Sequence, residues 1–226
     1  MEVHKPKPVH SWREFLSEIG IIVIGVTIAL AGEQAVEAIH WRHVVEAQRE
    51  AMDESITEHL GAVKARAALQ PCVDARLAQL AIVFKRHADG KPLGIKGRVG
   101  RPQNASAGDE VWQMAVQSGA LNHMSLAERT AYAGAFSNYA NLSGLRDDAD
   151  GSWIDLAALD DADALSEGDW VELRRSYGQV VAKEARVANV NDYVLGTMTM
   201  GKSVPKVTLE DAIHSPYAKD FCQPLI

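Results

Sequence analysis

The chain has 226 residues, of which 47% are apolar, and a formal net charge of −7 at pH 7. This length and apolar content suffice to bury a sizeable core, with room for one folded domain or two small ones after an apolar N-terminal segment. The negative charge leaves no basic face of the kind that binds nucleic acids, so we expect no nucleic acid partner.

An apolar segment follows a short tail, residues 1–14, which we expect to be flexible. The run from Ile19 to Gly32 is uncharged but spans only about 21 Å as a helix, less than the ~30 Å hydrocarbon core of a bilayer. Extended back to Phe15, past one acid, it spans about 27 Å, and its large apolar side chains favour insertion by roughly 3–6 kcal/mol. We therefore predict a transmembrane helix with interfacial flanks at residues 15–41.

Four residues mark the predicted membrane interfaces. Trp12 and Trp41 would lie about 43 Å apart along a helix, which matches the ~40–45 Å between the headgroup zones where tryptophan concentrates. Glu18 and Glu33 sit at the two edges of the apolar core. An acid there is tolerated near headgroups, whereas one that turns inward usually pairs with another group or faces a cavity.

Two other interpretations of this segment stay open. Ala29-Leu30-Ala31 fits the cleavage site of a secretory signal peptide, although Glu14 and Glu18 stand where such a peptide carries positive charge. The segment also fits the buried core helix of a soluble protein. We favour the membrane anchor.

The orientation rests on a small charge difference. Lys5, Lys7 and Arg13 precede the span, and Arg42 and Arg49 follow it. Because cytoplasmic flanks are enriched in Lys and Arg, we expect a cytoplasmic N-terminus and an extracytoplasmic domain, with the lipid bilayer as the first partner.

The residues of the span also resemble a known group. Trp12-Arg13-Glu14-Phe15-Leu16, Glu18-Ile19 and the aliphatic, glycine-containing run to Leu30 resemble the N-terminal signature of uncharacterised bacterial single-span membrane proteins, a domain of unknown function. The resemblance implies a bacterial inner-membrane anchor, so the extracytoplasmic domain expected from the charge difference would be periplasmic. It covers residues 12–30 and carries over no catalytic residue.

Three small residues share one face of the predicted span. Gly25, Ala29 and Gly32 are spaced i, i+4 and i+7, which would let a second helix approach closely. They predict packing of this helix against itself or against other membrane subunits. The alternative is that glycine is simply common in membrane helices and that both flanking acids face water.

The remainder, residues 42–202, is expected to form a helical extracytoplasmic domain. Apolar residues recur at helical spacing from the span to about Leu69, so the membrane helix should continue into it. A second helix is expected from Cys72 to Ala88, ended by Asp89-Gly90, and a loop at residues 91–108.

Later helices carry recognisable start signals. Helical spacing resumes at Glu110–Leu121, Ser125 opens a helix towards Leu145, and Ser166 opens a long one to about Met200. We expect an acidic helix end and turn at Asp147–Gly151, which lacks the ligand spacing of a calcium loop, and a short helix at Trp153–Leu159. Residues 203–226 should be an irregular tail, and the fold all-α.

The two cysteines predict a disulfide. Cys72 and Cys222 lie in the part that we place outside the cytoplasm, where a disulfide would persist. It would add roughly 4–5 kcal/mol by chain entropy and fasten the tail to the second helix. Two unpaired thiols are the alternative.

The strongest metal-like pattern is Glu37 with His40, followed by His43 one turn on. Di-iron bundles use two Glu-x-x-His copies, and here the nearest second copy, Asp211 with His214, lies in the tail. Haem ligation by either histidine of the first pattern is a further alternative. We predict no metal and no cofactor.

Two functions remain after this survey. The sequence contains no glycine-rich phosphate loop, nucleophile elbow or HExxH pattern. We therefore expect a non-enzymatic, membrane-anchored protein that acts as a homo-oligomer or as an accessory subunit of a larger membrane complex. The alternative is an anchored periplasmic enzyme or ligand-binding domain, which a deep polar pocket would favour.

Overall fold

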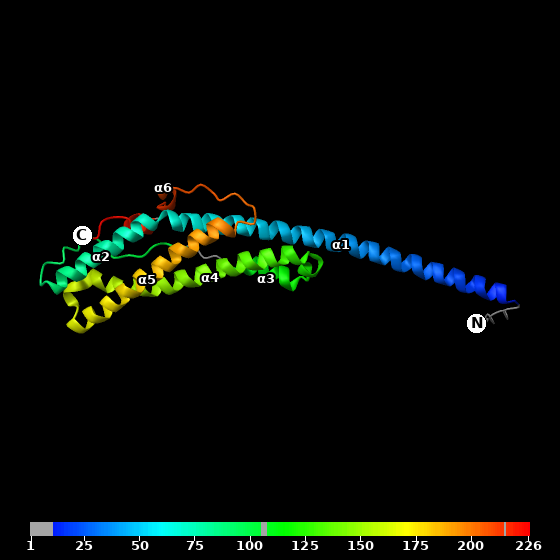
Figure 1. Cartoon of the computed structure of the whole chain (residues 1–226), viewed down its shortest axis with the longest axis horizontal. Helices are drawn as coiled ribbons and strands as arrows, with labels where there is room; N and C mark the ends of the chain where they lie inside the picture. The colour runs from blue at the N-terminus through cyan, green and yellow to red at the C-terminus, as the bar shows by residue number, and fades with distance from the viewer. Residues whose placement is uncertain (1–10, 105–107, 215) are drawn as a thin grey trace, which may run out of the picture. The chain divides into compact units, whose positions relative to one another are not determined.

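The computed structural model describes residues 11–104, 108–214 and 216–226 (Figure 1). It is 79% helical, and its described residues contain no strand, so the predicted all-α fold is confirmed. The chain divides into two compact units, Met1–Gln48 and Arg49–Ile226. The elements in order are α1 (Trp12–Ala68), α2 (Gln70–Ala88), α3 (Glu110–Gln117), η1 (Ala120–His123), α4 (Leu126–Leu156), η2 (Ala157–Ala164), α5 (Glu167–Thr197), α6 (Leu209–Ala212) and α7 (Pro216–Phe221).

The first unit is formed by the N-terminal part of α1. The Ser11 hydroxyl caps this helix by accepting a hydrogen bond from the Glu14 N–H at 3.2 Å. Its most apolar window has a mean hydropathy of 2.2, and none of that window is buried by the rest of the chain. Length and composition thus make α1 a candidate membrane span, and the predicted continuation into a longer helix is confirmed. Residues 1–10 of the predicted tail lie outside the described part.

The break between α1 and α2 follows from one proline. Pro71 stands in the first turn of α2, where its missing N–H costs nothing, but its ring cannot continue the preceding helix. At the other end of α2, Gly90 has a φ of +65°, a left-handed conformation that glycine adopts without strain. The predicted second helix therefore ends where the sequence indicated.

Three helical segments of the second unit share a core whose buried residues recur at three- or four-residue spacing. The α4 and α5 helices run antiparallel, side by side (Figure 1). The C-terminal part of α1 packs with them, as Arg66–Glu184 and Tyr132–Asp53 contacts show. Residues buried at this spacing are Met52, Ile56, Leu60 and Val63 of α1, Ala135, Tyr139, Leu142, Arg146, Ala149, Trp153 and Leu156 of α4, and Val180, Glu184, Val187, Asn191 and Val194 of α5. Such spacing is typical of helices that pack by knobs into holes.

The expected turn at Asp147–Gly151 is wrong, because α4 runs through it to Leu156. The acidic side chains are satisfied within the fold: Asp150 accepts hydrogen bonds from Arg101 and Asn104. Trp153, the first residue of the expected separate helix, is fully buried on the α4 face. Packing of this face therefore outweighs the low helix propensity of the aspartates and the glycine.

A second core joins α2, the end of α4, η2, the start of α5 and the C-terminal segment. The α5 helix begins with a reciprocal capping box between Ser166 and Asp169. The segment 203–226 is less irregular than expected, since it contains α6 and α7. Its Phe221 and Leu225 are buried in this core, which explains why the tail is ordered against the domain.

Candidate functional site

Of the predicted interface residues of α1, Trp12, Glu18 and Glu33 are exposed and Trp41 is partly exposed. Trp12 is 72% exposed and its ring lies 5.5 Å from that of Phe15. Glu18 and Glu33 are exposed as well. The indole N–H of Trp41 donates to the Glu37 carboxylate one turn before it, at 3.4 Å. The membrane-interface role of these four residues stays a prediction.

The small-residue face is open. A side chain built at Gly25 or Gly32 would meet no atom within 4 Å, and Ala29 is exposed. The large apolar side chains around them are at least half exposed: Ile21, Ile22, Val23, Ile24, Val26, Ile28 and Leu30. The surface that the sequence marked for helix packing is therefore not used within this chain.

The metal-like pattern is not assembled. The Glu37 carboxylate accepts from Trp41, and the His40 ring lies against Trp41 edge-on at 5.6 Å. No group of three or more His, Cys, Asp or Glu that could hold a metal occurs among the described residues. The second copy is used differently, because Asp211 forms the capping box of α6 with Thr208. These side chains already have structural partners.

The two cysteines form a disulfide, and polar contacts reinforce it. Cys72 of α2 is joined to Cys222, 150 positions further along the chain. The buried guanidinium of Arg76 donates to the carbonyl oxygens of Phe221 at 2.7 Å and Gln223 at 2.9 Å. The Gln79 side chain accepts from the Leu225 N–H at 2.6 Å. The C-terminal segment is thus fastened to α2 at several points.

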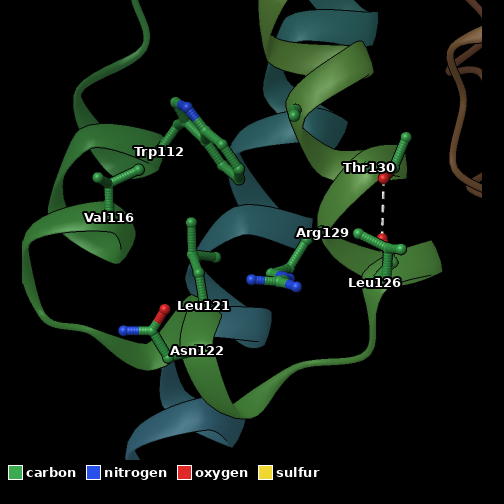
Figure 2. Close-up of a pocket in the computed structure, with 8 residues that line it drawn as sticks. Trp112, Val116, Leu121, Asn122, Leu126, Arg129 and Thr130 are labelled. Carbon is green, nitrogen blue, oxygen red and sulfur yellow. Dashed lines mark hydrogen bonds between the residues drawn. The ribbon is translucent and has the colours of Figure 1, made fainter.

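One shallow depression lies between α3, η1 and α4 (Figure 2). It has a volume of about 410 Å³ and is lined by Trp112, Val116, Leu121, Asn122, Leu126, Arg129, Thr130 and Ala133. Arg129 and Leu121 point towards its centre in Figure 2. The Arg129 Nε is buried and has no hydrogen-bond partner among the described residues. The depression is an open, mostly apolar surface with one cationic side chain, Arg129.

A buried serine–histidine pair is part of the core rather than a catalytic dyad. The Ser55 hydroxyl lies 3.5 Å from Nδ1 of His59, too far for a strong hydrogen bond. The His59 ring stacks on Tyr139 at 4.9 Å and meets Phe136 edge-on. Burial lowers the pKa of His59 from its usual 6.5, against the raising effect of Glu58, so the ring is neutral at pH 7.

The most unusual site of the second unit is a group of buried polar side chains that we name the arginine layer: Arg66 of α1, Arg146 of α4, and Glu184 and Asn191 of α5. Each of the four is at most 2% exposed. Arg66 forms an ion pair with Glu184, whose second oxygen accepts from the Trp153 indole N–H at 2.7 Å. Arg146 donates to the Asn191 side-chain oxygen at 2.8 Å. Buried charges of this kind are costly unless paired.

The arginine layer was not expected from the sequence, although the sequence contains a signal for it. Arg146, Glu184 and Asn191 each occupy a position where the three-and-four spacing demands an apolar residue. A charged residue in phase with buried neighbours on both sides indicates a buried polar contact. Which residues meet one another depends on how the helices pair, and a single helix does not show that.

Comparison with known proteins gives no further guide to the site. No protein-family model matches the chain, and no curated protein or solved structure is significantly similar to it.

Proposed function

We propose that this chain is a membrane-anchored, non-enzymatic helical protein that works as a homo-oligomer or as an accessory subunit of a larger membrane complex. The observation that carries the proposal is the apolar N-terminal window of α1, none of which is buried by the other described residues. A surface of this size would aggregate in water, so it calls for lipid or another helix.

The open small-residue face supports the choice of an assembling protein over a simple anchor. Gly25 and Gly32 leave room for a second helix, since no atom of the described residues lies within 4 Å of a side chain built at either position. Close backbone approach is the main source of helix association in lipid, where apolar side chains gain nothing from leaving the bilayer. The partner is a second copy of the chain or the span of another subunit.

We further propose a bacterial inner-membrane location, with the N-terminus in the cytoplasm and the helical domain in the periplasm. The resemblance of residues 12–30 and the positive charges before the span motivate it. The disulfide between Cys72 and Cys222 fits this topology because such bonds persist in oxidising compartments. A reporter enzyme that is active only outside the cytoplasm, fused after Ile226, should be active, and an inactive fusion would reverse the orientation.

Assembly is tested by enlarging the small-residue face. Gly25→Leu and Ala29→Leu should lower the yield of cross-linked oligomer in native membranes and the mass of the particle in mild detergent, while insertion is unchanged. Val23→Leu is the matched control, because Val23 lies on the opposite side of the helix. Wild-type chain that yields only monomer, with no co-purified component, would refute the proposal.

The depression of Figure 2 favours a second candidate, a ligand-binding domain. Its apolar lining and the buried Arg129 Nε suit an amphiphile with an acidic head, such as dodecanoate. If this candidate holds, dodecanoate should change the Trp112 fluorescence of the chain in nanodiscs, and Arg129→Gln should weaken the response. Trp112→Phe is the reference for this fluorescence signal. If dodecanoate leaves the Trp112 fluorescence of the wild type unchanged, this candidate function is refuted.

A further inference from the structure

The arginine layer holds more buried positive charge than negative charge. Arg66 and Arg146 are 2% and 1% exposed, and Glu184 is the buried carboxylate that faces them. Glu184 is committed to Arg66 and to the indole N–H of Trp153. Arg146 is left with the neutral side-chain oxygen of Asn191 as its acceptor. One guanidinium therefore has no buried counter-charge.

The arginine layer also has more hydrogen-bond donors than acceptors. Four buried nitrogen atoms have no partner among the described residues: Nη1 of Arg66, Nε and Nη1 of Arg146, and Nδ2 of Asn191. All four are donors, and no buried acceptor of these side chains lacks a partner. Since buried donors are nearly always satisfied, the layer calls for an acceptor beyond those that the described residues supply.

The neighbouring carboxylates do not fill this role. The two oxygens of Asp150 accept from Arg101 at 2.9 Å and from Asn104 at 3.0 Å. Asp148 pairs with Lys183 at 2.9 Å, and Asp147 is exposed. Asp150 is linked to Arg66 through Asn104, whose side-chain oxygen accepts from the Arg66 Nε at 3.1 Å. None of these carboxylates accepts a hydrogen bond from Arg146 among the described residues.

Loss of a proton does not remove the excess charge either. Burial, and then the repulsion from Arg66, lowers the pKa of Arg146 to about 10, while Glu184 and Asp147 oppose the shift. The guanidinium is therefore still protonated at neutral pH. A water molecule could accept the free hydrogen bonds, but it would not neutralise the charge.

We propose that the arginine layer is a binding site for one small monovalent anion of the halide type, held by the free donors of Arg66, Arg146 and Asn191. A single negative charge balances the excess of one guanidinium, whereas a dianion such as phosphate would overcompensate it. The anion would connect α1, α4 and α5, so the stability of the helical domain would depend on chloride itself and not on ionic strength alone. This site is separate from the proposed membrane-helix face.

Thermal unfolding of the full chain in mild detergent tests the proposal. Chloride replaces gluconate at constant ionic strength, so general screening is the same in every sample. The unfolding temperature of the wild type should rise with chloride and depend on its concentration as binding to the native state requires. Arg146→Met should abolish the response, and the exposed Arg174→Met on α5 should keep it.

A second variant retains both guanidinium charges. Asn191→Leu removes one donor to the anion and should raise the half-effective chloride concentration about tenfold, the factor that corresponds to one lost hydrogen bond to an ion. Binding is also read directly from the chloride-35 NMR line, which wild-type chain should broaden and Arg146→Met should not. A wild type that neither responds to chloride nor broadens the line would overturn the proposal and leave the layer to water. An equal response in Arg146→Met would place the anion elsewhere and overturn it too.

Discussion

At the scale of single residues, the buried Glu184 joins three helices. Its two carboxylate oxygens serve Arg66 of α1 and Trp153 of α4 from within α5. A buried ion pair adds little compared with an apolar replacement of both partners, but removal of one partner leaves a charge stranded in the core. Conversely, the exposed pair of Glu172 and Arg175 on the same helix is open to water and screened by salt.

This contrast gives a direct prediction. Glu184→Gln keeps the size of the side chain but removes its charge, so it should lower the free energy of unfolding by about 3–5 kcal/mol. Glu172→Gln, on the exposed face of the same helix, should lower it by less than about 1 kcal/mol. Urea unfolding followed by circular dichroism measures both. Similar losses in the two variants would mean that the arginine layer is solvated.

Glu128 allows a test of how the free energy of unfolding depends on pH in the acidic range. It accepts two hydrogen bonds from Arg49, at 2.5 and 3.0 Å, and this contact lowers the pKa of Glu128 from its usual 4.5. A lowered pKa in the native state means that the contribution is present above pH 4.5 and is lost as the pH falls through the native pKa.

Glu128→Gln should therefore be less stable than wild type at pH 7, and the two stabilities should converge as the pH falls through the lowered native pKa of Glu128. The free energy of unfolding of both chains, measured from pH 7 to pH 3, shows this convergence or its absence. If the two curves of unfolding free energy against pH stay parallel, Arg49 does not stabilise the ionised form of Glu128.

At the scale of elements, the sequence predicts the helices well where local signals decide them. Ser125 and Ser166 begin α4 and α5 as expected, and Pro71 and Gly90 delimit α2. The prediction failed at Asp147–Gly151, where four residues of poor helix propensity indicated a turn. The buried neighbours of that segment lie on α1 and α5, and the sequence of α4 alone does not contain them.

The difference between local signals and contacts between helices also explains why the disulfide was expected and the arginine layer was missed. Two cysteines in one chain allow a single intramolecular pairing, so composition is enough to suggest it. The partner of a buried arginine is chosen from many acids and amides, and the pairing of Arg146 with Asn191 follows only from the antiparallel register of α4 and α5. The pairing of two cysteines can be inferred from composition, whereas the register of two helices depends on how their whole faces pack.

The interior position of Gly151 in α4 leads to a third prediction. A side chain built there meets no atom within 4 Å, and the residue is exposed. Gly151→Ala should raise the free energy of unfolding by about 0.5–1 kcal/mol, because alanine restricts the unfolded chain and favours the helix. Gly97→Ala should destabilise instead, since its new methyl group would lie 2.7 Å from the Pro224 carbonyl oxygen. Thermal and urea unfolding measure both; a loss of stability in Gly151→Ala would indicate that the helix does break there.

At the scale of the whole molecule, the C-terminal segment closes the second unit. Phe221 and Leu225 complete the core that α2 shares with α5, and the Leu225 carbonyl accepts from the backbone N–H groups of Lys96 and Gly97. Covalent, polar and apolar contacts thus hold the same short segment. The disulfide constrains the unfolded chain, while the other contacts act in the folded one.

Removal of the disulfide should therefore weaken the domain without unfolding it. Cys72→Ser combined with Cys222→Ser should lower the free energy of unfolding by about 2–5 kcal/mol, because the bond closes a loop of 150 positions. Arg76 and the buried Phe221 should still hold the segment, so the helical circular dichroism of the variant should match that of wild type. Wild-type chain under reducing conditions is the control and should show the same loss. A double variant that is as stable as the oxidised wild type would show that the segment is held by its non-covalent contacts alone.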